Sequence, residues 1–181
     1  IYPALTTKLT TDDKLDIPLY LKNIEAQINA GIHGCVIAGS LGEASTLSQK
    51  EKISLLDATI AHVDGRIPVV MNIAEQSTAK AVKAAHNAQK SGADGLMMLP
   101  PMRYFADSHE TVEFYKSVAN SCDLPIMIYN NPYDYKIEIT ISMFEELLKI
   151  KNIGATKEST RDVTNVTPVS YTHLRAHETR P

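Results

Sequence analysis

The feature that most constrains the fold is a regular recurrence of short apolar segments along the chain. These segments begin near residues 4, 35, 68, 96, 126 and 153, at steps of 31, 33, 28, 30 and 27 residues. Amphipathic runs with helical spacing separate them. A repeated unit of about 30 residues that holds one strand and one helix indicates parallel strands joined by crossover helices. The sequence therefore predicts an α/β fold built on a parallel sheet.

Cap and stop signals set the limits of the expected elements. Ser48 and Glu51 fit a capping box at the start of one helix, Asp16 is a candidate cap for another, and Gly92 closes a third. The expected strands are 4–9, 35–38, 68–73, 96–99, one that starts at 126, and 153–156. The expected helices are 18–30, one that starts after 48, 78–90, 108–121 and 141–150.

Two architectures use this repeated unit, the open doubly wound sheet and the eight-stranded barrel. A count of six strands alone favours the open sheet. However, candidate polar residues follow several different strands instead of gathering at one crevice, which favours the barrel. We therefore expect an incomplete (β/α)8 TIM barrel with about six βα units over residues 1–168.

The last residues do not continue this pattern. From Val169 the sequence has no usable periodicity and looks like the translation of a synthetic sequencing adapter. We therefore expect 169–181 to be a non-native tail and the barrel to be truncated at its C-terminal side. His173 and His177 lie in this tail, so their i,i+4 spacing is not interpreted as a metal site.

Composition excludes several classes of function. The 181 residues carry a formal net charge of -3, with 44% apolar and 22% charged residues, as in an ordinary soluble domain. The lysines are scattered, which argues against nucleic-acid binding, and no apolar run approaches the ~20 residues of a membrane span. Cys35 and Cys122 form no motif, which favours reduced thiols and a cytoplasmic location.

Two of the expected strands end in residues that are able to do chemistry. Ile126 to Ile128 leads to Tyr129, and the segment from Ile153 leads to Lys157. Lysine is uncommon inside a buried strand. An amine in an apolar pocket is more easily deprotonated, and the neutral amine is the form that attacks a carbonyl. The simpler alternatives are a lysine that extends to solvent and a tyrosine that only packs.

A glycine turn follows the strand at 35–38. Gly39 and Gly42 flank Ser40 and Leu41, and glycines allow a tight turn whose backbone N–H groups can cradle a carboxylate. The alternative is a plain connection between a strand and a helix.

Together these segments are similar to those of a known family. The segments Gly39 to Glu43, Tyr129-Asn-Asn-Pro132 and Lys157-Glu158, in this order and spacing, resemble the dihydrodipicolinate synthase/N-acetylneuraminate lyase family. The resemblance covers about residues 2–167, roughly two thirds of a family barrel. Each motif alone is weak evidence for the family, but the three motifs together, in the same order and spacing, are strong evidence.

The resemblance implies a role for each of these residues. Lys157 would form a Schiff base with a 2-oxo acid such as pyruvate, and Tyr129 would shuttle protons. Ser40 would relay protons or hold the substrate carboxylate, which the turn at Gly39, Ser40 and Leu41 would bind through its backbone N–H groups. The resemblance implies no metal and no separate cofactor, because the lysine imine itself serves as the electron sink. It also implies a homotetramer for the full-length protein.

Departures from the family pattern keep several functions open. Leu41 stands where the best-known family members have a residue with a second hydroxyl, so one contact to the substrate carboxylate is lost. Asp134 stands where the synthases carry an arginine that binds a second carboxylate of their substrate. A carboxylate at this position would repel that substrate, which argues against dihydrodipicolinate synthase proper. Tyr104 does not clearly match the tyrosine that those synthases take from a neighbouring subunit. The first expectation is therefore a Schiff-base lyase or aldolase. The alternatives are a hydro-lyase or deaminase of a sugar-acid or hydroxyproline-derived 2-oxo acid, and an inactive fragment or non-catalytic 2-oxo acid binder.

Overall fold

The computed structural model describes residues 1–102, 104–161 and 164, so the expected tail at 169–181 lies outside the described residues. Its strands are β1 (Cys35–Ile37), β2 (Val69–Ile73), β3 (Gly95–Met98), β4 (Ile126–Asn130) and β5 (Ile153–Glu158). Its helices are α1 (Ile17–Asn29), α2 (Gln49–Val63), α3 (Thr78–Ser91), α4 (Ser108–Ala119), α5 (Pro132–Tyr135) and α6 (Ile141–Leu147), with a 3-10 turn, η1 (Ser40–Gly42), after β1.

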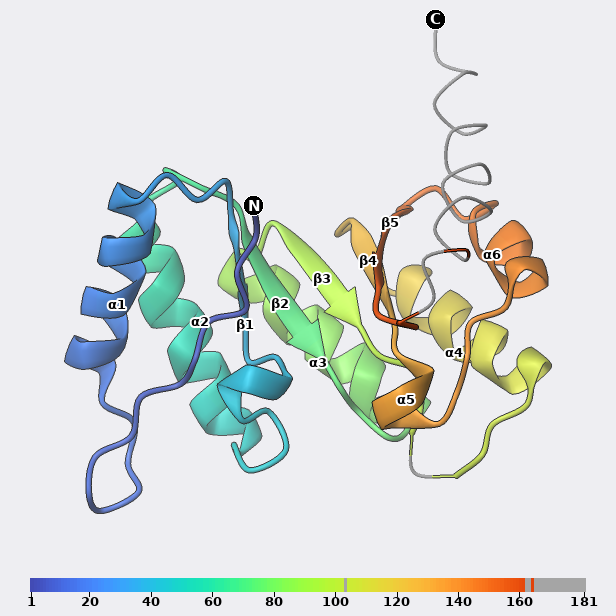
Figure 1. Ribbon diagram of the computed structural model, residues 1–181, viewed down its shortest axis with the longest axis horizontal. Helices are drawn as coiled ribbons and strands as arrows, with labels where there is room; N and C mark the ends of the chain where they lie inside the picture. Colours follow the sequence, from blue (N-terminus) through green and yellow to red (C-terminus); the bar gives the residue numbers. More distant parts are fainter. Residues whose placement is uncertain (103, 162–163, 165–181) are drawn as a thin grey trace, which may run out of the picture.

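The five strands form one parallel sheet in the order β1-β2-β3-β4-β5. An open doubly wound sheet reverses its strand order at a switch point, and this sheet does not reverse. The crossover helices follow one another along the outer side of the strands (Figure 1). The fold is therefore an incomplete βα-barrel, as the positions of the polar residues predict.

The first expected strand, 4–9, is wrong as an extended element. Leu5 donates its N–H to the carbonyl of Val36 at 2.9 Å, so this segment does pair with the edge of β1. Beyond it the chain turns back on itself, because Thr10 N–H donates to Lys14 O at 2.8 Å and Leu9 pairs antiparallel with Leu15. The polar run from Thr10 to Asp13 forms this turn, which shortens the strand to an isolated bridge.

The expected helix boundaries are largely confirmed. The capping box of Ser48 and Glu51 is present at the start of α2, and Asp16 accepts a hydrogen bond from Leu19 N–H at the start of α1. Gly92 ends α3 with a φ of 90°, a left-handed conformation that glycine adopts without strain. None of the described helices has the length and apolar character needed to cross a membrane.

The sheet has two faces of different character, because alternate residues of a strand point to opposite sides. The helix-facing side contributes to a large core that includes Ile37, Ile73, Met98, Ile128 and Phe144. The inner face holds a smaller cluster of Val36, Val70, Met97, Leu99 and Tyr129. Cys35 and Cys122 are both buried and unpaired, and burial raises the pKa of the Cys35 thiol to about 12.

Candidate functional site

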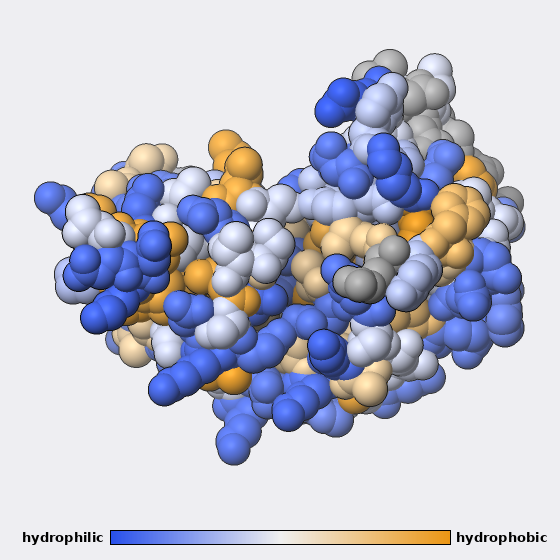
Figure 2. Space-filling view, turned by 90° about the horizontal axis from the view of Figure 1, so that it is seen from below, coloured by the Kyte–Doolittle hydropathy of each residue, from blue (hydrophilic) through white to orange (hydrophobic). Residues whose placement is uncertain are grey.

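The residues expected at the site gather at the carboxyl end of the sheet. Tyr129 of β4 and Lys157 of β5 are register partners on adjacent parallel strands. The Lys157 Nζ lies 4.1 Å from the centroid of the Tyr129 ring. The sheet itself therefore holds the amine and the phenol side by side. Figure 2 shows the molecule from below, and on this face hydrophilic residues surround hollows that contain hydrophobic residues.

The phenol of Tyr129 is held in place by Asn131, the residue that caps the next helix, α5. Tyr129 is only 8% exposed, and its hydroxyl accepts a hydrogen bond from Asn131 Nδ2 at 3.1 Å. The same Nδ2 donates to Asp134 Oδ2 at 2.7 Å, while Asn131 Oδ1 accepts from the N–H of Asp134. Asn131 is therefore both the N-cap of α5 and a hydrogen-bond donor to Tyr129.

Tyr135 at the end of α5 is a site residue that sequence reasoning missed. Its hydroxyl is hydrogen-bonded to Ser40 Oγ. Its ring packs edge-on against Tyr129, with centroids 5.7 Å apart and planes at 77°. Burial raises the pKa of Tyr135, the hydrogen bond with Ser40 opposes this shift, and Tyr129 and Asp134 add to it. The sequence signals only the helix that carries Tyr135, since Asn131-Pro132 is a helix start as well as a strand stop, and it does not indicate the contact with Ser40.

The glycine turn after β1 has the tight geometry that its sequence predicts. Gly39 O accepts hydrogen bonds from the N–H groups of Gly42 at 3.0 Å and Ala44 at 3.2 Å. A Cβ on Gly42 would lie 2.8 Å from Leu5 O, so only glycine fits there without movement. In the described part of the chain, the N–H groups of Ser40 and Leu41 donate to no backbone carbonyl. The Leu41 side chain is 70% exposed.

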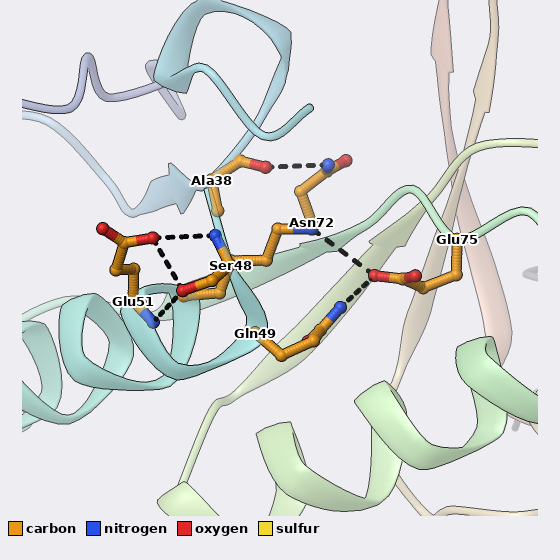
Figure 3. A network of polar contacts seen from close by, with 7 residues as sticks. Ala38, Ser48, Gln49, Glu51, Asn72 and Glu75 are labelled. Atoms are coloured by element: carbon orange, nitrogen blue, oxygen red, sulfur yellow. Dashed lines mark hydrogen bonds and ion pairs between the residues drawn. The ribbon is translucent and has the colours of Figure 1, made fainter. Parts of the chain in front are cut away.

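Asn72 of β2 supports this turn from the neighbouring strand. Its Nδ2 donates to the carbonyl of Ala38 at 2.9 Å, and Ala38 has a φ of 50°, which is uncommon for a residue with a side chain. Asn72 is 3% exposed, and its Oδ1 has no hydrogen-bond partner among the described residues. The contact is visible in Figure 3.

A cavity of about 810 Å³ adjoins this group of residues, and Ser40, Asn72 and Tyr135 belong to its lining. Farther along its wall, Lys52 and Glu75 form an ion pair at 3.4 Å, and Gln49 also donates to Glu75 (Figure 3). Lys157 and Tyr129 are not among the lining residues. This cavity thus meets the site at Ser40 and Tyr135 and not at the amine.

The structure brings together Lys157, Tyr129 and, through Tyr135, Ser40. It places Gly39 and Leu41 in the turn that carries Ser40. Tyr104 is 78% exposed and borders a different hollow, one shared with Phe105. Within residues 1–102, 104–161 and 164, no group of three His, Cys, Asp or Glu residues is placed to hold a metal ion.

A parallel sheet in sequential order, with its polar residues at the carboxyl ends of the strands, defines the class of βα-barrels. Comparison with known proteins gives the family within this class. The model of the Dihydrodipicolinate synthetase family matches residues 1–177. The chain belongs to this family.

Several relatives share this similarity. A 4-hydroxy-tetrahydrodipicolinate synthase from Exiguobacterium sibiricum is 34% identical over 160 residues, which are 88% of this chain and 55% of the relative. An uncharacterized DapA-like lyase from Halobacterium salinarum is 29% identical over 163 residues, 90% of this chain and 54% of the relative. The chain thus spans a little over half the length of these relatives.

Two solved structures show the same fold. A prophage protein of the dihydrodipicolinic acid synthase family from Escherichia coli K12, in complex with pyruvate, has a TM-score of 0.92 and 28% identity. The match covers 98% of this chain and 60% of that protein. A chloride-inhibited dihydrodipicolinate synthase from Acinetobacter baumannii, complexed with pyruvate, has a TM-score of 0.93 and 26% identity, covering 96% and 60%. Because several of the relatives are named as synthases, the comparisons do not support the exclusion of dihydrodipicolinate synthase proper that Asp134 and Leu41 suggested.

Proposed function

We propose that Lys157 forms a Schiff base with the keto group of a pyruvate-type 2-oxo acid, and that the protein is a lyase or aldolase of this chemistry. The single observation that carries the proposal is the Lys157 Nζ held 4.1 Å from the ring of Tyr129, at the ends of adjacent strands. Two structural relatives that carry pyruvate support the choice of ligand.

The other site residues have distinct roles in this proposal. Tyr129 donates and accepts protons next to the amine, and Asn131 keeps its hydroxyl in place. The N–H groups of Ser40 and Leu41, in the turn that begins at Gly39, bind the substrate carboxylate. The Ser40 hydroxyl, which is hydrogen-bonded to the Tyr135 hydroxyl, relays protons or holds the same carboxylate.

The imine explains how the reaction proceeds. Loss of water from the adduct of the lysine amine and the keto carbon gives a protonated imine, which accepts the electron pair of a bond broken at the next carbon. Aldol cleavage, aldol formation and β-elimination all use this electron sink. The proposed mechanism includes no metal and no separate cofactor.

Asp134 supports a second candidate, a hydro-lyase or deaminase of a hydroxylated 2-oxo acid on the same scaffold. Its carboxylate lies 2.7 Å from the amide that holds Tyr129, and it would repel a substrate with a second carboxylate nearby. Product analysis separates the reactions. Carbon–carbon fragments indicate a lyase, loss of water or ammonia indicates elimination, and condensation with an aldehyde indicates a synthase.

Borohydride trapping with pyruvate tests the proposal. We expect a reduced adduct on Lys157, located by peptide mass spectrometry, and no adduct in Lys157→Arg. Lys151→Arg is the matched control, because Lys151 is exposed and precedes the same strand. An adduct that persists in Lys157→Arg, or its absence from the unmodified chain, would overturn the proposal. The homotetramer and the cytoplasmic location stay predictions.

A further inference from the structure

We propose that Tyr135 is a proton-relay residue of this site, acting through the Ser40 hydroxyl, and that the pair connects the reacting centre to the adjoining cavity. This inference rests on the proposed function of Lys157. It adds a residue from the same chain that the sequence motifs do not include.

The placement of Tyr135 is the first argument. Its ring contacts Tyr129, whose own ring lies beneath the Lys157 amine. Its hydroxyl bonds Ser40, which lies 95 residues away in sequence on the turn after β1. Ser40 and Tyr135 line the cavity, whereas Tyr129 and Lys157 do not. The hydroxyl pair therefore lies where the amine–phenol group meets the cavity.

The chemistry is the second argument, because a Schiff-base reaction moves protons in and out of the site. When the imine of pyruvate becomes an enamine, a C–H bond breaks and its electron pair forms the C=C bond. The C=N pair returns to nitrogen, and the proton leaves to an oxygen base. A chain of two hydroxyls passes that proton onward when one oxygen accepts a proton while the other releases one. The reverse path returns a proton to the carbon.

The state of Tyr135 fits this role. Burial raises its pKa, so the phenol remains protonated at neutral pH and is able to donate. Packing against Tyr129 requires only the ring, and a phenylalanine would supply it. The hydroxyl has a separate purpose, since it is the atom that contacts Ser40.

The short helix α5 holds the tyrosine at this position. Asn131 caps the helix, Pro132 starts it with a suitable φ, and Tyr135 N–H donates to Asn131 O at 3.1 Å. Two residues earlier on the same helix, Tyr133 is 55% exposed and contacts Arg161. Tyr133 therefore provides a matched control in the same element.

The test compares two readouts on the full chain and on Tyr135→Phe. The first readout is the yield of the borohydride adduct with pyruvate. The second is the rate at which the pyruvate methyl group exchanges hydrogen for deuterium in D₂O, followed by proton NMR. We expect the adduct yield to stay within about twofold, while the exchange rate falls by about 100-fold, the lower end of what a positioned proton-transfer group contributes.

Two further variants sharpen the test. Tyr133→Phe should change neither readout. Ser40→Ala should lower the exchange rate as Tyr135→Phe does, and the double variant should show no additional loss, because both residues act in one path.

Each outcome decides something. Unchanged exchange in Tyr135→Phe, with normal trapping, would overturn the relay while the function of Lys157 stands. Equal loss of trapping and exchange would show that the hydroxyl shapes the pocket, which also overturns the relay. An unmodified chain that gives no adduct would overturn the proposed function, and the role of Tyr135 with it.

Discussion

The helix-facing side and the inner face of the same sheet differ in both packing and chemistry. Met98, on the helix-facing side, belongs to a core that runs through five helices, whereas Met97, one residue earlier, belongs to a small cluster beside Ser40 and Tyr135. The helix-facing side is the larger of the two, and the hydroxyls that it buries on Tyr20, Thr59 and Tyr115 are hydrogen-bonded within it. The inner face carries the phenol of Tyr129 and the amide of Asn72, whose oxygen has no hydrogen-bond partner among the described residues, and it adjoins the cavity. Stability thus comes mainly from one side of the sheet, which leaves the other side able to carry polar groups.

The largest expected effect tests this division directly. Met98→Ala should lower the free energy of unfolding by about 2–5 kcal/mol, because the dense helix-facing core cannot collapse into the space. Met97→Ala removes the same atoms from the inner face and should cost less, since side chains beside the cavity are able to relax. Urea unfolding of both variants provides the measurement. Equal losses would show that the two faces are packed alike.

A smaller effect is expected at the turn after β1. Gly42→Ala should cost roughly 1–3 kcal/mol and weaken pyruvate trapping, because the new Cβ would lie 2.8 Å from Leu5 O. Gly39→Ala is the stability control, since its Cβ would meet no atom closer than 3.9 Å. If both variants have the same free energy of unfolding, the turn can move to accommodate the new Cβ despite its close approach to Leu5 O.

The smallest effect is expected on the outer surface. Arg66 donates two hydrogen bonds to the Glu25 carboxylate and lowers the pKa of that group. A lowered pKa stabilises the folded state above the ordinary carboxyl pKa, and this contribution is lost as the pH falls through the lowered value. Glu25→Gln should therefore lower the melting temperature slightly at neutral pH. The difference from the unmodified chain should disappear as the pH falls from about 5 to about 3. A difference that persists in acid would point to a packing effect of the side chain.

The sequence predicted those parts of the fold that depend on local signals. Ser48, Asp16 and Gly92 mark helix ends by capping and backbone preference, and the structure has all three. The prediction from sequence failed where an element depends on partners that are distant along the chain. The segment after Ala4 has an apolar pattern, but Leu9 pairs with Leu15 and not with the sheet.

The distinction between local signals and distant partners also explains which site residues could be predicted from the sequence. Tyr129 and Lys157 end apolar strands, so their proximity follows from parallel pairing, which periodicity predicts. Tyr135 and Asn72 carry no such signal. One contacts Ser40 from 95 residues away, and the other supports Ala38 from the adjacent strand. Contacts of this kind arise from the folded geometry, and a single sequence does not display them.

The double role of Asn131 has a consequence for how this protein tolerates change. One side-chain nitrogen serves both the phenol of Tyr129 and the carboxylate of Asp134, while the oxygen of the same amide starts α5. Aspartate, usually an equally good helix cap, would put an acceptor where a donor is required and bring two negative charges together. At this position the most conservative exchange by shape is therefore among the most disruptive by charge. Folding of the helix and placement of the phenol cannot vary independently of each other.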